Sequence, residues 1–72
     1  MTDHTSPERI DALMTIEEVA DLLRMPVATI RYWRVLGNGP RGFIVGRRLR
    51  YLRQDVLDWL NEQRESTGRG VA

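Results

Sequence analysis

Ten residues, Val27 to Leu36, are enclosed by two strong helix breakers, Pro26 before them and Gly37-Asn38-Gly39-Pro40 after them. Proline has no amide hydrogen to donate and glycine is a poor helix former, so a helix here has to begin and end at these points. Arg31 and Arg34 fall on one face of such a helix. The apolar residues recur at helical spacing and are expected to pack inward: Val27, Ile30, Trp33 and Leu36. The segment therefore predicts a short helix with one side for a protein core and another side for a second partner.

A second helix is expected immediately upstream. Thr15 and Glu18 have the spacing of a capping box, in which each side chain accepts a hydrogen bond from the other residue's backbone amide. The helix should end near Arg24, because Pro26 cannot donate a hydrogen bond inside it. Its apolar face is made of Ile16, Val19, Ala20, Leu22 and Leu23.

The joint between the two predicted helices is only two residues long, Met25 and Pro26. So short a joint forces a sharp angle between the helices. Two short helices joined in this way form a helix-turn-helix, whose second helix lies in the major groove of DNA. Periodicity alone also allows a plain helical hairpin with solvated arginines, so the choice depends on the segment after Gly39-Pro40.

A β-hairpin is predicted in that segment, with short strands at residues 43–45 and 48–51 around a turn at Gly46-Arg47. Period-two alternation predicts which side chains share a face: Phe43 and Val45 with Leu49 and Tyr51 on one side, and Arg48 and Arg50 with Ile44 on the other. A hairpin this short is not stable alone, so it must lie against the helices. We expect it to form a wing whose arginines face solvent or DNA.

The last predicted helix runs from Arg53 to Gln63 and closes the core with Val56, Leu57, Trp59 and Leu60. No internal repeat or second domain is visible. The predicted layout is a mobile acidic arm at 1–12, a winged helix-turn-helix domain at 13–64 and a mobile tail at 65–72. The fold class is mainly α with a small β-hairpin, in the order α-α-β-β-α. A domain of 72 residues has a thin margin of stability, about 3–5 kcal/mol.

Charge is distributed very unevenly along the chain, although the net charge is only +1. Residues 22–54 contain eight arginines and no acidic residue, whereas the segments on both sides are net negative. Such a block is the electrostatic footprint of a protein that binds the phosphate backbone. The chain has no lysine, and arginine suits bidentate recognition of phosphate and guanine. High genomic G+C content also favours arginine over lysine, but it does not explain the clustering.

The sequence lacks the residues that several classes of protein function require. The chain has no cysteine and one histidine, His4, so the sequence predicts neither a disulfide nor a metal site. The carboxylates sit where helix ends are expected, and their contribution to the helix dipole explains them without acid–base catalysis. No apolar run approaches the ~18 residues of a membrane span and no signal peptide is visible. We therefore expect a soluble, cytoplasmic protein that is not an enzyme and uses no cofactor or small-molecule ligand.

Taken together, these segments resemble a small excisionase of the winged-helix, MerR-like type, closest to those of actinobacterial temperate phages. The resemblance covers about Met14 to Leu60. The matching segments are Thr15 to Leu23, Thr29 to Arg34, Gly37 to Arg41, Val45 to Tyr51, Asp55-Val56 and Trp59-Leu60. Pro26 departs from the family, in which many members have a serine or threonine helix cap at that position.

This resemblance implies a recombination directionality factor, which bends DNA and directs a phage integrase toward excision of the prophage. The implied partners are double-stranded DNA of the attachment-site arm, the integrase, and neighbouring copies of the same protein bound cooperatively, head to tail. MerR regulators proper carry a long dimerisation helix and an effector domain after the winged helix.

The candidate DNA-binding residues fall into three groups. Those of the recognition helix are Ala28, Thr29, Arg31, Tyr32 and Arg34. Those of the wing are Arg41, Arg47, Arg48 and Arg50, and two weaker candidates are Arg24 and Arg53. Arg31 is the best candidate for a direct contact, either to a guanine edge or to a phosphate.

Two other functions fit the sequence. A transcriptional repressor with this fold would need a symmetric dimer and a palindromic site, and no segment predicts a dimer interface. A protein-interaction module would use the acidic first helix or the arginine-rich surface, and the arginine block with its wing argues against it.

Overall fold

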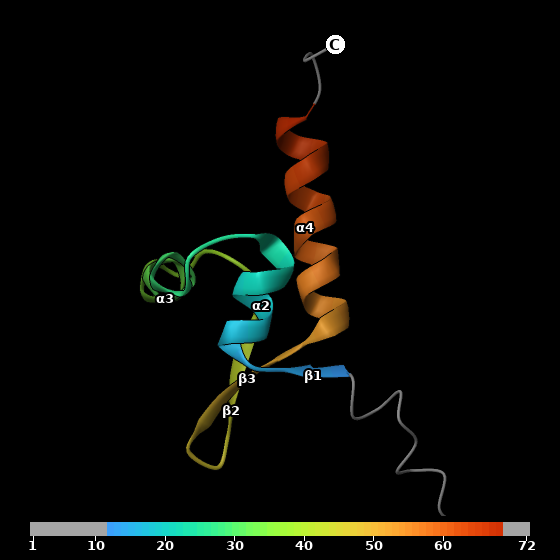
Figure 1. Ribbon diagram of the computed structural model, residues 1–72. Helices are drawn as coiled ribbons and strands as arrows, with labels where there is room; N and C mark the ends of the chain where they lie inside the picture. The colour runs from blue at the N-terminus through green and yellow to red at the C-terminus, as the bar shows by residue number, and fades with distance from the viewer. Residues whose placement is uncertain (1–11, 69–72) are drawn as a thin grey trace, which may run out of the picture.

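The structure is a computed structural model that describes residues 12–68. It confirms the predicted fold class, three helices with a small antiparallel sheet arranged as a winged helix-turn-helix (Figure 1). The elements in chain order are β1 (Leu13–Met14), α2 (Ile16–Leu23), α3 (Val27–Leu36), β2 (Gly42–Val45), β3 (Arg48–Leu52) and α4 (Arg53–Thr67). Most of the expected acidic arm, including His4, and the last four residues lie outside the described part.

The predicted capping box starts α2 and is confirmed. The Thr15 amide donates to Glu18 Oε1 at 2.9 Å, and the Glu18 amide donates to Thr15 Oγ1 at 3.1 Å. The helix ends as predicted at Arg24, which is left-handed with φ 58°. The Met25 amide donates back to the Ala20 carbonyl at 2.9 Å, so the reversal itself uses the last turn's free carbonyls. The sharp angle between α2 and α3 is thus fixed by local hydrogen bonds.

Helix α3 begins after Pro26, whose carbonyl accepts hydrogen bonds from the amides of Thr29 at 3.0 Å and Ile30 at 3.3 Å. No side chain caps this end, as expected for a proline. Gly37 ends the helix with φ 80°, a conformation that costs glycine little because it has no Cβ.

The sheet has the strand order β1-β3-β2, with antiparallel pairing throughout. Strand β1 pairs Leu13 with Leu52 and Met14 with Tyr51. The sequence pattern did not predict β1, because two residues are too few to show a period and their pairing partners lie far away in the sequence. As a result β3 is the central strand, paired on one edge with β2 and on the other with the segment that leads into α2.

The hairpin forms where predicted, but the predicted sharing of faces is wrong. Phe43 pairs with Arg50, Val45 with Arg48, and Ile44 with Leu49. Because directly paired residues point to the same side of an antiparallel sheet, Phe43 and Val45 share the arginine face. Ile44 lies on the opposite face with Leu49 and Tyr51. The two-residue turn explains this, since it makes Val45 and Arg48 direct partners.

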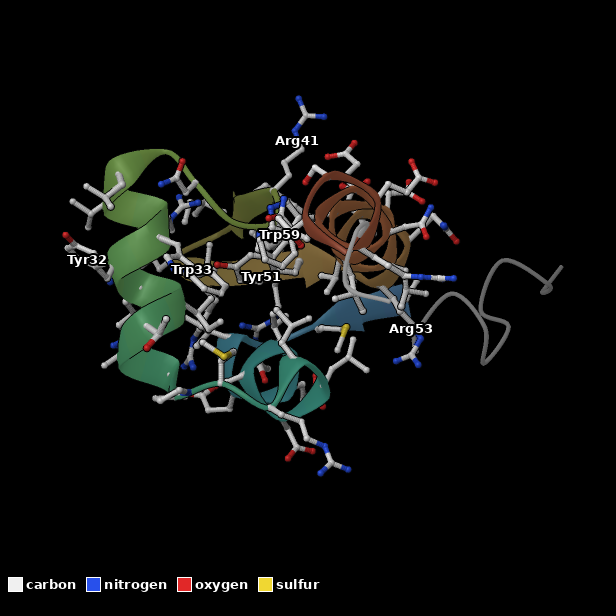
Figure 2. All side chains as sticks on the ribbon, turned by 90° about the horizontal axis from the view of Figure 1, so that it is seen from above. Tyr32, Trp33, Arg41, Tyr51, Arg53 and Trp59 are labelled. Atoms are coloured by element: carbon white, nitrogen blue, oxygen red, sulfur yellow. The ribbon has the colours of Figure 1, made fainter. Side chains whose placement is uncertain are left out.

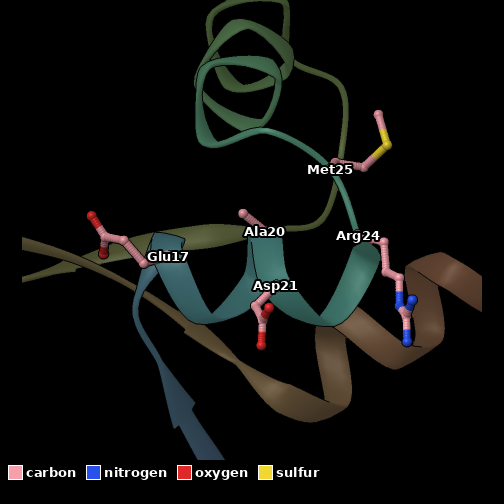
Figure 3. Close-up of a pocket in the computed structure, with 5 residues that line it drawn as sticks. All are labelled: Glu17, Ala20, Asp21, Arg24 and Met25. Atoms are coloured by element: carbon pink, nitrogen blue, oxygen red, sulfur yellow. The ribbon is translucent and has the colours of Figure 1, made fainter.

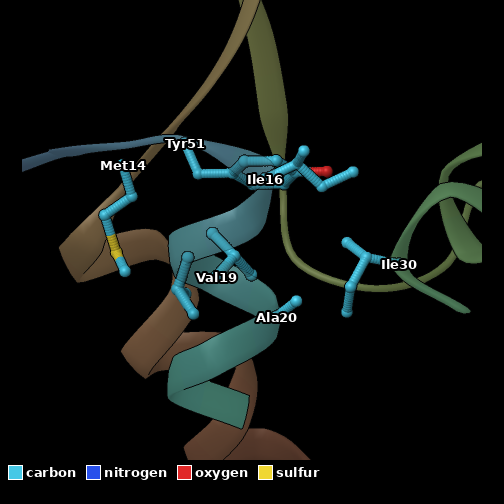
Figure 4. Close-up of a cluster of buried hydrophobic side chains, with 7 residues drawn as sticks. Met14, Ile16, Val19, Ala20, Ile30 and Tyr51 are labelled. Atoms are coloured by element: carbon cyan, nitrogen blue, oxygen red, sulfur yellow. The ribbon is translucent and has the colours of Figure 1, made fainter. Parts of the chain in front are cut away.

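The core lies between α2, the inner face of β3 and the first turns of α3 and α4 (Figure 4). Its buried residues are Met14, Ile16, Val19, Ala20, Ile30, Tyr51 and Val56, and Leu22, Leu23, Val27, Trp33 and Leu49 pack around them. Trp33 and Trp59 meet between α3 and α4, with ring centroids 5.3 Å apart and planes tilted by 43° (Figure 2).

Two residues expected in the core are exposed instead. Leu36 is 52% exposed, because a spacing of three residues drifts by about 60° per step around a helix of 3.6 residues per turn. Leu36 therefore lies roughly 120° around α3 from Ile30. Leu60, on α4, is 42% exposed.

Helix α4 is also longer than predicted, ending at Thr67 and not at Gln63. Its last turn is stabilised by the Thr67 hydroxyl, which donates to the Gln63 carbonyl at 2.6 Å.

Stability at alkaline pH should report the burial of Tyr51, which is 1% exposed. Burial raises the pKa of this phenol above its ordinary 10.0, and the positive charge of Arg34 opposes part of the rise. The unfolded state then ionises first, so we expect the free energy of unfolding to be constant below pH 10 and to fall above it. Urea unfolding from pH 8 to 11.5 measures this.

The composition simplifies the interpretation of that measurement, because the chain has neither cysteine nor lysine. Tyr51→Phe should remove the fall in stability. Tyr32→Phe, at an exposed tyrosine, should leave it in place; an equal effect of both substitutions would rule out burial as the cause.

Candidate nucleic-acid interface

The burial of Ile30 determines which side of α3 is exposed. Ile30, 1% exposed, fixes the inward direction, so Ala28, Arg31, Tyr32 and Val35 fall on outer faces. Tyr32 is 62% exposed and Val35 82% exposed, and Figure 2 shows Tyr32 pointing away from the body of the protein. Thr29 is partly exposed. The outer side of α3 is thus a continuous surface that makes no contribution to the core.

Arg31 and three wing arginines share one hollow between α3, the start of α2 and the wing. This hollow has a volume of about 430 Å³ and is lined by Ile16, Glu17, Arg31, Arg47, Arg48, Leu49 and Arg50. We call it the arginine trough. Four guanidinium groups and one carboxylate line it, so its surface is cationic. The fold therefore joins the recognition helix and the wing into one surface.

The wing arginines reach the trough from different backbone positions. Arg47 lies in the two-residue turn beside Gly46, whose φ is 64°. Arg50 is half-buried, and its Nη1 donates to the carbonyl of Leu49 at 2.8 Å. That hydrogen bond holds one side of the guanidinium group and leaves its other N–H groups available to a ligand.

The other candidate arginines lie outside the trough. Arg34 is close enough to Tyr51 for its charge to influence the phenol. Arg41 extends from the edge of the molecule opposite α2, and Arg53 lies on the side away from α3 (Figure 2). Arg24 lines a separate hollow of about 470 Å³ on the outer side of α2, with Glu17, Ala20, Asp21 and Met25 (Figure 3). One surface therefore cannot engage all the candidates at once.

Sequence reasoning missed three residues of the trough, Ile16, Glu17 and Leu49. The sequence pattern identifies Glu17 only as an acid in the first turn of a helix, where it does lie. Its presence among arginines depends on the angle between α2 and the wing, which no local pattern encodes. Strand alternation places Leu49 on the inner face of the wing, and it lies partly against the core and partly in the trough.

A third hollow, of about 420 Å³, lies between the end of α3 and α4 and is lined by Trp33, Gly37, Asn38, Gly39, Trp59, Glu62 and Gln63. Gly39 packs directly on the indole of Trp33, since a Cβ there would approach Trp33 Cβ to 3.1 Å. Within residues 12–68, no three potential ligands among histidine, cysteine and carboxylate side chains are grouped as a metal site would require. In the same part of the chain, no helix has the length and apolar character needed to cross a membrane.

Residues 13–64 match the protein family described as helix-turn-helix domain. That family includes excisionase-like DNA-binding proteins. No curated protein matches the chain.

Proposed function

This chain belongs to the helix-turn-helix domain family, a DNA-binding family, and we propose that it acts as an excisionase. It binds specific double-stranded DNA in the arm of an attachment site, bends it, and directs a phage integrase toward excision of the prophage. It performs no catalysis itself and uses neither a cofactor nor a small-molecule ligand. It acts in the bacterial cytoplasm, at the nucleoid.

The observation that carries this proposal is the arginine trough. Arg31 on α3 and Arg47, Arg48 and Arg50 on the wing line the same hollow. A duplex whose major groove receives α3 brings its backbone and the next groove against the wing. Phosphate contacts from several arginines fix the position of the protein, and contacts from α3 to base edges supply the specificity.

The recognition helix and the wing have distinct roles in this proposal. Arg31 contacts a guanine edge or a phosphate, Ala28 allows close approach to a thymine methyl group, and Thr29 and Tyr32 donate to phosphates. Arg34 and Arg41 reach the backbone beyond the trough. Arg24 and Arg53, which face elsewhere, remain the weakest candidates.

Neighbouring copies bind the arm side by side, head to tail, and the integrase contacts the assembled complex.

Selection of bound duplexes from a random-sequence pool, followed by footprinting, tests the proposal. We expect protected sites arranged as direct repeats, together with a bend. A palindromic site bound by a dimer would indicate a repressor instead, and no protection would indicate a protein-interaction module. The affinity should also fall with salt, with a log–log slope of about −4 if about five phosphates are neutralised. A flat salt profile would contradict any DNA-binding role.

A further inference from the structure

The tip of the wing carries two exposed aliphatic side chains. Ile44 is 56% exposed and Val45 is 47% exposed, immediately before the turn at Gly46-Arg47. Neither belongs to the core or to the layer of residues packed around it. Apolar residues exposed side by side on a hairpin favour association with other chains. Because Ile44 and Val45 do not contribute to the core, their exposure indicates a role in binding.

The two side chains point to opposite faces of the hairpin. Ile44 is paired with Leu49, which lines the arginine trough, and Val45 is paired with Arg48. Each face of the hairpin therefore carries one aliphatic side chain close to the turn, and on one face that side chain, Val45, lies beside Arg48. A membrane or a large apolar protein surface would contact a broader patch than two residues provide.

The residues around this tip are cationic. Arg47 forms the turn with Gly46, Arg48 follows it, and no acidic residue occurs between residues 22 and 54. A cationic rim is complementary to phosphate, and an aliphatic tip is complementary to the faces of stacked bases. Proteins that bend DNA through the minor groove combine these two features, with arginines along the groove and an apolar side chain inserted between base pairs.

We propose that Ile44 and Val45 form an apolar wedge that enters the minor groove and partly unstacks one base-pair step. This rests on the proposed DNA binding. With α3 in the major groove, the shared trough holds the wing against the adjacent groove, so the wedge meets the duplex at a fixed distance from Arg31. Opening a base step toward the minor groove bends the helix axis, and the arginines beside the tip hold the phosphates on both sides of the opening.

The wedge also gives sequence preference without a hydrogen bond to a base. Pyrimidine–purine steps unstack most easily, so sites should favour TA or CA/TG where the wing lies. Conversely, a mismatch placed at that step removes part of the unstacking cost and should tighten binding of the wild-type protein roughly tenfold.

The test compares the wild-type protein with the double variant Ile44→Thr, Val45→Thr on a duplex obtained by selection. Threonine keeps the β-branched shape and strand preference but presents a polar hydroxyl, and thermal melting verifies that the fold is intact. Energy transfer between dyes at the duplex ends measures the bend, and 2-aminopurine at the step beneath the wing reports unstacking. Leu60→Thr, at an exposed leucine on α4, is the matched control.

We expect the double variant to lose most of the bend, the 2-aminopurine signal and the tenfold gain on the mismatched duplex, while Leu60→Thr retains all three. If the folded double variant binds and bends the duplex like the wild-type protein, the wedge is wrong and the wing contacts only the backbone. If the wild-type protein binds no duplex, the proposed function itself fails.

Discussion

Replacement of Ile30 by alanine should leave the domain largely unfolded at room temperature. Ile30 is 1% exposed and is the one fully buried side chain that α3 contributes to the core. Truncation of a buried isoleucine to alanine costs about 2–5 kcal/mol, comprising the lost transfer energy and the cavity that remains. A single core of this size provides only about 3–5 kcal/mol in total. The substitution therefore removes most of the stability.

Urea unfolding followed by far-ultraviolet circular dichroism measures this effect. Val35→Ala is the matched control, because Val35 lies on the same helix and is 82% exposed; its effect should stay within about 0.5 kcal/mol. A melting temperature of the Ile30 variant close to that of the wild-type protein would show that α3 is not held by this side chain.

Replacement of the next residue, Arg31, by alanine should weaken DNA binding and leave the stability of the fold intact. Arg31 is exposed and lines the arginine trough, so the substitution should leave the melting temperature nearly unchanged. We expect the affinity for a specific duplex to fall by about 1–3 kcal/mol, which is roughly 5–150-fold. Titration of labelled duplexes at fixed salt measures it.

The same titrations distinguish the two possible contacts of Arg31. A contact to guanine predicts relaxed preference at one base pair and no rescue by lysine, which lacks the bidentate fork. A contact to phosphate predicts an equal loss on all sequences and a salt slope smaller by about one. Arg64→Ala removes the same charge from the far part of α4 and should change neither; an unaltered affinity in the Arg31 variant would refute the docking of α3 in the major groove.

The parts of the fold that depend on local chemistry could be predicted from the sequence. Thr15 and Glu18 specify the start of α2 by their spacing, Pro26 and Gly37 bound α3, and Gly46-Arg47 sets the turn of the wing. Each of these signals acts over four residues or fewer, so no knowledge of the rest of the chain is needed to interpret it.

The parts that depend on distant contacts could not be predicted. Strand β1 forms only because Leu13 and Met14 pair with Leu52 and Tyr51 of β3, which lie far along the chain. The predicted faces of the wing were reversed for β2 because a one-residue error in register moves every side chain to the other side. The burial of Leu36 was overestimated because a three-residue spacing drifts around the helix.

The candidate site also has some features that the sequence predicts and others that depend on distant contacts. The arginine block was visible from composition, and it includes Arg31, Arg47, Arg48 and Arg50, which the fold brings together. The sequence did not show that Arg41 and Arg53 extend elsewhere, or that Glu17 faces the same arginines. Those facts are set by the angles between elements. Which of these residues touch DNA is still a prediction, and titration of the arginine variants addresses it.

The position of β3 at the centre of the sheet has a mechanical consequence. Because β3 is paired with β2 on one edge and with β1 on the other, the return strand of the wing is connected through β1 to the capped start of α2. A force applied at the wing tip is therefore transmitted to the helix pair, and the hairpin cannot swing freely about its base. In the proposed complex, the spacing between α3 and the wing is therefore set by the protein, and the spacing between the two DNA grooves has to match it.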